Sequence, residues 1–382
     1  MRVIRILGSI AGLAVALAVL AFVAIRFSPS LQDRLLTSTV AANLAKNNNA
    51  LLKDKSLKII LCGTGSPMPD PSRANACAAV VAGGHMVLID AGPGAWAKIA
   101  QMRLPGGAIE AVFLTHLHSD HFGGLGEVSL QGWINGRKQA LDVYGPASPP
   151  VVATPLGGNG QSHIPAGTDV VVAGLQEAYR ADTLFRVEHH DMKYMPPAGE
   201  KMNAHVVPTP AIGVAETVYD RDGLKISAFL VNHHPIEPAF GYRVEYGGRV
   251  AVISGDTMKF ENVATMSKGA DLLVHEALNE DMVSLLANQV EASGNARLAK
   301  MARDTINYHT SPVEAAAIAN EAHVKLLVLT HLVPPLPNAI ARRMFMRGVS
   351  AARGEGETVL GDDGLMIVLP ESETGYRLKN LL

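Results

Sequence analysis

The sequence predicts a mixed α/β domain that follows an apolar N-terminal segment. Short apolar runs recur between residues 57 and 369, and Gly-rich or Pro-rich turns bound each of them, which is the pattern of β-strands. Helical patterns lie between some of these runs. Several runs end close to a histidine or an aspartate, which places polar side chains at the ends of strands, where sites commonly form in proteins that combine sheets with helices.

The predicted elements fill a chain of 382 residues, 48% of them apolar, which is enough for a large core. Helices are expected at Gly123–Trp133, Met282–Ile306 and Val313–Ala322. Strands are expected at Leu57–Cys62, Ala78–Ala82, Met86–Ile89, Ala111–Leu114, Ile226–Val231, Phe240–Glu245, Arg249–Ile253, Leu272–Val274, Leu326–Leu329 and Leu365–Leu369.

Residues 1–30 are predicted to be a membrane anchor or signal segment. Arg2 and Arg5 precede an uncharged stretch over 6–25, which as a helix would span roughly 30 Å, the thickness of a bilayer's hydrocarbon core. No good small-x-small cleavage site follows, which favours an uncleaved transmembrane helix over a removed signal. The basic residues ahead of the stretch predict an exported domain anchored in the cell membrane, with secretion after signal cleavage as the alternative.

The rest of the chain divides near residue 57. Residues 31–56 are expected to form a juxtamembrane helix and a linker, and residues 57–382 a single folded domain. The 33 basic and 35 acidic residues give a net charge of −2, so no bulk attraction to nucleic acid or to an anionic membrane surface is expected.

The two cysteines are too few for a disulfide framework. Cys62 lies inside an apolar run, where burial as a small hydrophobic residue is the favoured interpretation. A disulfide with Cys77 and a catalytic thiol are the lesser alternatives.

A run of metal-ligand residue types lies directly after the predicted strand Ala111–Leu114. Three imidazoles and one carboxylate occur within six positions, and this combination suits zinc. The backbone then turns through a glycine-rich stretch toward a helix. The sequence therefore predicts a metal site built from His116, His118, Asp120 and His121.

Three later strands lead to residues of the same kind, namely His233, Asp256 and His331. If these strands lie side by side, their ends converge with the histidine-rich run and provide seven candidate ligands. Seven is too many for one tetrahedral zinc and suits two Zn²⁺ ions. His234 is the alternative to His233.

These motifs resemble those of the metallo-β-lactamase-fold hydrolases, whose signature His-x-His-x-Asp-His stands at 116–121. The closer similarity is to the branch that contains ribonuclease Z-type zinc phosphodiesterases and zinc-dependent arylsulfatases. The motifs that carry it, in the family's order over about 57–335, are Gly63–Pro67, Ile89–Gly92, Pro238–Arg243, Ser254–Thr257, His275–Ala277, His309–Ser311 and Leu329–His331.

The resemblance implies a four-layer αββα sandwich with a dinuclear zinc site at the seam between two β-sheets. One zinc would be held by His116, His118 and His233, the other by Asp120, His121 and His331. Asp256 would bridge the two ions. Asp90 would orient ligands or loops from behind the site.

The resemblance also implies ester hydrolysis. Two zinc ions that share a water lower its pKa to about 7, so a hydroxide nucleophile exists at neutral pH. Asp120 would accept the proton of the nucleophile. His309, paired with Glu276, would give a proton to the leaving group, and the carboxylate would keep this imidazole protonated.

One departure from the ribonuclease Z pattern concerns the substrate. Several of those enzymes carry a long arm that grips tRNA, but here only ten residues separate Arg243 from Ser254, which is enough for a hairpin only. We therefore predict a dinuclear zinc hydrolase for a phosphodiester or sulfate ester of a small molecule, with no nucleic-acid partner. Residues 150–224 and 280–308 are expected to wall the pocket, and a homodimer is left open.

Four alternatives remain from the sequence alone. The chain could be a tRNA 3′-processing endoribonuclease or a β-lactam hydrolase on the same fold. A di-iron redox enzyme usually carries a glutamate where this chain has His118, and a non-catalytic binding module would show decayed ligands, whereas all seven positions are filled.

Overall fold

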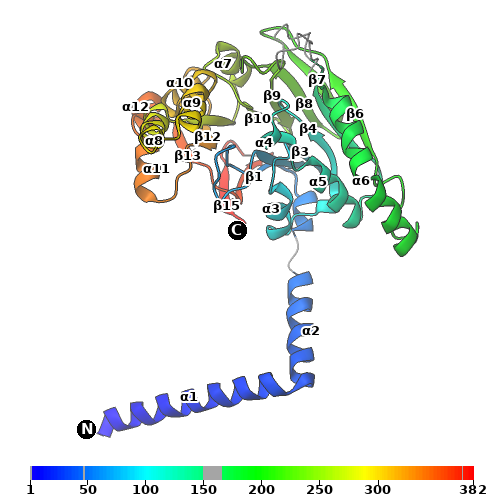
Figure 1. The fold of residues 1–382 in the computed structure, drawn as a ribbon, viewed down its shortest axis with the longest axis vertical. Helices are drawn as coiled ribbons and strands as arrows, with labels where there is room; N and C mark the ends of the chain where they lie inside the picture. Colours follow the sequence, from blue (N-terminus) through cyan, green and yellow to red (C-terminus); the bar gives the residue numbers. More distant parts are fainter. Residues whose placement is uncertain (1, 46–47, 149–165, 372) are drawn as a thin grey trace. The chain divides into compact units, whose positions relative to one another are not determined.

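The computed structural model describes residues 2–45, 48–148, 166–371 and 373–382. The chain separates into two units, Met1–Asn48 and Asn49–Leu382. The first unit contains helices α1 (Arg2–Phe27) and α2 (Pro29–Ala45). The second contains all the strands of the described part of the chain (Figure 1).

The N-terminal unit differs from the predicted membrane anchor. Within the residues that the structure describes, no single helix is both long enough and apolar enough to cross a membrane. The segments Gly12–Phe27 and Pro29–Ala42 reach that threshold of length and composition only together, with a bend of 95° between them. A transmembrane helix over 6–25 is therefore not supported.

The larger unit is built on two β-sheets. Across the first sheet the strand order is β15-β14-β1-β2-β3-β4-β5-β6, and across the second it is β13-β12-β11-β10-β9-β8-β7. The first sheet comprises β1 (Ser56–Gly63), β2 (Cys77–Ala82), β3 (His85–Ile89), β4 (Ile109–Phe113), β5 (Leu141–Pro146), β6 (Met202–Val207), β14 (Leu365–Pro370) and β15 (Arg377–Asn380). The second comprises β7 (Ala215–Arg221), β8 (Leu224–Leu230), β9 (Phe240–Tyr246), β10 (Arg249–Ile253), β11 (Leu272–Leu278), β12 (Leu326–Val333) and β13 (Glu357–Leu360).

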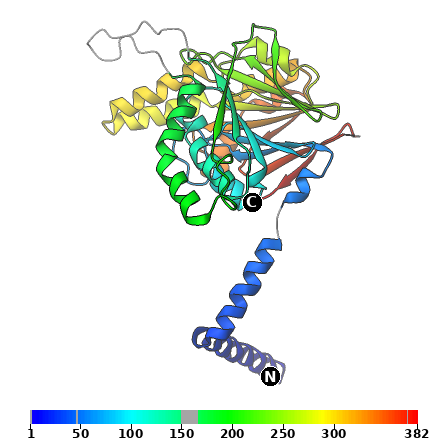
Figure 2. The same cartoon turned by 90° about the vertical axis from the view of Figure 1, so that its right-hand side faces the viewer.

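The sheets pack face to face, with helices on both outer sides (Figures 1 and 2). The helices are α3 (Ala95–Gln101), α4 (Ser119–Phe122), α5 (Leu125–Ile134), α6 (Thr168–His190), α7 (Glu261–Ser267), α8 (Glu280–Ala292), α9 (Ala296–Thr305), α10 (Pro312–Glu321), α11 (Ala339–Phe345) and α12 (Val349–Arg353), with 3₁₀ turns η1 (Asn49–Leu52), η2 (Gly106–Ala108) and η3 (Ile306–Tyr308).

Strand β1 shows how the sequence produces this layering. Ile59 packs into a core shared with residues of the second sheet such as Ile226, whereas Ile60 packs into a core under α3 and α5. Successive side chains of a strand point to opposite faces, so a strand buried on both faces is apolar throughout. A third core lies between the second sheet and helices α7, α10, α11 and α12. The predicted order of helix, sheet, sheet and helix is confirmed.

Two predicted elements differ in detail. The expected helix Met282–Ile306 is two helices, α8 and α9, because Gly294 adopts a φ of +89° that a helix interior does not allow, and Asn279 and Asn295 cap the two helices. The predicted wall 150–224 contains α6, β6 and β7, while its part 150–165 lies outside the described residues.

The preferred interpretation of the cysteines is wrong. Both are buried, as expected for Cys62, but the sulfurs of Cys62 and Cys77 form a disulfide. The bond joins neighbouring strands, because β1 pairs antiparallel with β2 and Gly63 lies opposite Cys77. That register follows from the β1–β2 pairing, which a lone apolar run around Cys62 does not reveal.

Removing the disulfide is expected to destabilise the domain. The bridged cysteines are 15 residues apart, and closing a loop of that length stabilises a fold by about 3 kcal/mol in the chain-entropy description. The double variant Cys62→Ala/Cys77→Ala should unfold at a lower denaturant concentration than the oxidised protein. A reductant should shift the wild-type midpoint in the same direction and leave that of the variant unchanged. Equal midpoints for oxidised and reduced wild type would contradict this prediction.

Candidate metal centre

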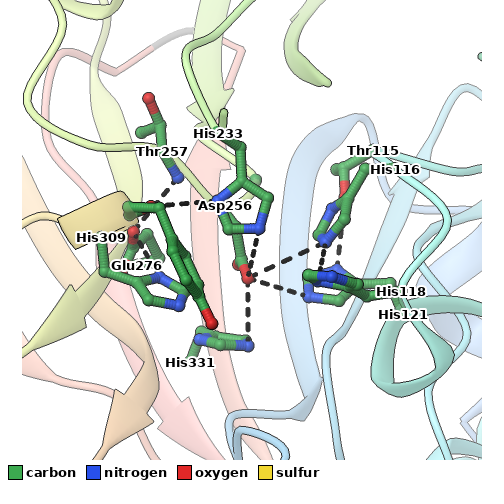
Figure 3. A network of polar contacts seen from close by, with 12 residues as sticks. Thr115, His116, His118, His121, His233, Asp256, Thr257, Glu276, His309 and His331 are labelled. Atoms are coloured by element: carbon green, nitrogen blue, oxygen red, sulfur yellow. Dashed lines mark hydrogen bonds and ion pairs between the residues drawn. The ribbon is translucent and has the colours of Figure 1, made fainter. Parts of the chain in front are cut away.

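The ends of strands from both sheets meet at one place. His116 and His118 follow β4, Asp120 and His121 lie in α4, and the remaining ligand candidates come from the second sheet. There His233 follows β8, Asp256 follows β10 and His331 lies in β12 (Figure 3). Strands β10, β11 and β12 run parallel, so their carboxyl ends share one edge. The structure thus brings all seven predicted ligands together at the seam between the sheets.

Asp256 lies at the centre of this cluster. Its Oδ2 atom is surrounded by the Nε2 atoms of four imidazoles, at 3.3 Å from His121, 3.4 Å from His331, 3.9 Å from His233 and 4.0 Å from His116. Burial by itself would raise the pKa of Asp256, but the imidazoles of His331 and His121 lower it well below its ordinary value. A central carboxylate that stays ionised fits the bridging position.

The ligand atoms fall into groups with the spacing of metal sites. The donor atoms of His116, His118 and His233 lie within 4.8 Å of one another, and so do those of Asp120, His121 and His331. In the first group, His116 Nε2 and His118 Nδ1 face each other at 3.0 Å. In the second group, His331 Nε2 is 3.1 Å from Asp120 Oδ2.

Unpartnered polar atoms test whether a metal fits here. Within the described residues, the buried Nε2 atoms of His121 and His233 and the Oδ1 atom of Asp256 have no hydrogen-bond partner. Buried polar atoms without partners are rare in native proteins and call for an explanation such as a bound ion. Imidazole nitrogens and carboxylate oxygens are zinc ligands, so the residues present fit zinc.

Hydrogen bonds behind two of the ligands fix their rings. His233 donates a hydrogen bond from Nδ1–H to the backbone carbonyl oxygen of Tyr308 at 3.0 Å. Its Nε2 atom, which then carries no proton, is free to bind a metal. His121 Nδ1 lies 2.7 Å from Asp90 Oδ2, and Asp90 also accepts from the backbone N–H and the hydroxyl of Thr115. Asp90 therefore has contacts that suit its predicted supporting role.

His233, not His234, belongs to this centre. His233 is 1% exposed, whereas the side chain of His234 is 74% exposed and pairs with Glu237 at 3.2 Å.

Glu276 and His309 form the expected pair. His309 Nδ1 lies 2.9 Å from Glu276 Oε1, which also accepts backbone N–H groups from Thr257 and Thr310, both at 3.1 Å. Burial and the Asp256 carboxylate raise the pKa of Glu276, whereas burial lowers the pKa of His309 to about 4. The prediction that a carboxylate keeps His309 protonated is therefore not supported. One proton held in the contact between the two side chains fits these directions.

Two contacts that support the centre could not be predicted from the sequence. Tyr308 supports His233 through its carbonyl oxygen, yet only its position next to His309 could have drawn attention to it. Asp363 accepts both the N–H and the hydroxyl of Thr64, 299 residues away, and the Thr64 carbonyl oxygen accepts the N–H of Leu332, beside His331. No local pattern signals a contact over such a separation.

Comparisons with known proteins identify the family. The model of the family described as "Beta-lactamase superfamily domain" matches residues 85–332. Ribonuclease Z of Mycolicibacterium paratuberculosis is 35% identical over 311 residues, which cover 80% of this chain and 96% of that protein. Ribonuclease Z of Mycobacterium bovis is 33% identical over 308 residues, with 80% and 96% coverage.

Solved structures share the fold. The short form of human tRNase Z matches with a TM-score of 0.54 and 22% identity, covering 82% of this chain and 99% of that one. The metallo-β-lactamase-fold protein YhfI of Bacillus subtilis matches with a TM-score of 0.56 and 18% identity, covering 82% and 100%. With its ligand cluster and these relatives, the chain belongs to the β-lactamase superfamily, in the branch of the ribonuclease Z homologues, and is a metallo-hydrolase that acts on ester bonds.

Proposed function

We propose that the protein hydrolyses phosphodiester bonds at this centre in the manner of a ribonuclease Z, with an RNA 3′ end as its first candidate substrate. The observation that carries the proposal is the Glu276–His309 pair, whose imidazole ring lies 5.5 Å from that of the ligand His331. A proton donor beside a metal centre suits an ester with a poor leaving group. The relatives named ribonuclease Z cover 80% of the chain and support RNA over the small molecule that we expected.

Each residue of the centre has a separate role in the proposed hydrolysis. Two Zn²⁺ ions would be held by Asp120, Asp256 and the histidines of the two ligand groups, namely His116, His118, His121, His233 and His331. In such a centre zinc supplies a water of lowered pKa and neutralises charge at the phosphoryl group. The Asp120 carboxylate accepts a proton from the attacking water. His309 releases a proton from Nε2 to the departing oxygen and takes up at Nδ1 the proton that it shares with Glu276. Glu276 holds His309 at Nδ1 and so fixes which nitrogen faces the reaction.

A second candidate is a smaller phosphodiester outside the cytosol. The link between β9 and β10 is a tight turn in which Tyr246 lies opposite Arg249, so no arm for a large RNA emerges there. The disulfide favours an oxidising compartment, which supports the exported location expected from the sequence. Sulfate ester cleavage has no support among the relatives named above, and we do not propose it.

A substrate panel tests both candidates. The purified, zinc-loaded protein is incubated with a precursor tRNA that carries a 3′ trailer, with bis(4-nitrophenyl) phosphate, with 4-nitrophenyl sulfate and with a chromogenic cephalosporin. We expect cleavage of the precursor tRNA and of the aryl phosphodiester, with the sulfate ester and the cephalosporin left intact. Cleavage of the aryl phosphodiester alone would favour the second candidate. No cleavage of either phosphodiester would refute the proposal.

A further inference from the structure

Tyr308 lies between two functional histidines of the centre. It ends the turn η3, which delivers His309, and its carbonyl oxygen accepts the Nδ1–H of His233 at 3.0 Å. Its ring packs edge-on against His233, with centroids 5.1 Å apart and an interplanar angle of 82°. The centroid of the His309 ring is 4.9 Å away. The tyrosine ring thus touches both a metal ligand and the proton donor.

The Tyr308 hydroxyl is available for a ligand. Within the described residues it makes no hydrogen bond, and the side chain is only partly buried. Because the ring packs against both His233 and His309, the hydroxyl that it carries lies beside the reacting centre.

We propose that the Tyr308 hydroxyl contacts the substrate, donating a hydrogen bond to a non-bridging phosphoryl oxygen. This inference rests on the proposed phosphodiester hydrolysis. Negative charge grows on the non-bridging oxygens as the nucleophile attacks, and a positioned donor stabilises that charge more strongly than it stabilises the bound substrate. The backbone of Tyr308 would meanwhile hold His233, so one residue would serve both the ligand set and the substrate.

The variant Tyr308→Phe removes the hydroxyl alone. The ring packing and the carbonyl contact to His233 remain, so we expect the variant to bind as much zinc as the wild type and to melt at the same temperature. The rate constant kcat for the phosphodiester should fall about 100-fold, since loss of one oxyanion donor costs roughly 10²–10³-fold in rate. Inorganic phosphate, titrated calorimetrically into the zinc-loaded protein, should bind about 10-fold more weakly, as expected when a hydrogen bond to a charged group is lost. Tyr194→Phe is the matched control, because that side chain is 72% exposed and should leave every reading unchanged.

Each outcome decides the inference. Wild-type kcat and phosphate affinity in Tyr308→Phe would overturn it, because packing alone would then account for the residue. Loss of zinc in this variant would also overturn it, because the hydroxyl would then support the ligands. If the wild type cleaves neither phosphodiester, the proposed function fails by itself. Phosphate affinity then decides Tyr308: weaker binding sustains the contact, and unchanged binding refutes it.

Discussion

The variant Asp256→Ala is expected to lose bound metal and hydrolytic activity together. In the wild type, the Oδ2 atom of Asp256 lies within 4.0 Å of the Nε2 atoms of His116, His121, His233 and His331. Truncation of this one side chain therefore removes an oxygen from both ligand groups. Loss of an outer hydrogen-bond partner of a ligand costs roughly 10- to 100-fold in metal affinity, and loss of a central ligand should exceed that. Metal analysis after dialysis against a chelator, with phosphodiester turnover measured in parallel, tests this.

Asp142→Asn is the matched control for that experiment. Asp142 also pairs with a histidine, with His205 Nε2 at 3.0 Å, but it lies in β5, and its hydrogen bonds and ion pairs within the described residues go to Asn203, His205 and Arg221. This variant should keep its metal and its activity. If Asp256→Ala binds as much metal as wild type, the bridging role is wrong even if activity is lost.

The ligand set could be predicted from the sequence because each ligand sits on a short local signal. An apolar run of four to six residues that ends near a histidine or aspartate identifies both the strand and the end that carries the side chain. His116, His233 and Asp256 each follow such a run, and the parallel pairing of β10, β11 and β12 brings Asp256 and His331 to one edge of the second sheet. The sequence already favours His233 over His234, and the burial of His233 and exposure of His234 agree with that choice.

Features that depend on long-range pairing could not be predicted in the same way. The disulfide requires the β1–β2 register, and the Thr64–Asp363 contact joins segments 299 residues apart. The protonation of His309 depends on how deeply the fold buries it, and a sequence shows only that a carboxylate is present elsewhere in the chain. The expected transmembrane helix over 6–25 lies within the single helix α1, but no single helix of the described residues is both long enough and apolar enough to cross a membrane.

The variant His309→Ala is expected to keep its metal and to lose activity selectively. His309 is the proposed proton donor, and general acid catalysis contributes roughly 10²–10⁴-fold to rate. That contribution matters most when the leaving oxygen is strongly basic, as in an RNA chain, and least for 4-nitrophenolate, which departs without a proton. We therefore expect a fall of about 10²-fold or more in kcat on RNA, and a much smaller fall on bis(4-nitrophenyl) phosphate.

The ratio of these two losses separates proton donation from metal binding. His309 also lies within ligand distance of His233 and Asp256, and of Glu276 and His331, so a role as a metal ligand is the competing explanation. A ligand would be needed for every substrate, and its removal would lower metal content and both activities together, as in Asp256→Ala. Glu276→Gln sharpens the distinction. The amide oxygen that this substitution introduces can still accept the N–H groups of Thr257 and Thr310, but the amide carries no charge. If the pair acts through a shared proton, Glu276→Gln should show the same dependence on the leaving group as His309→Ala. If it does not, the two variants should differ.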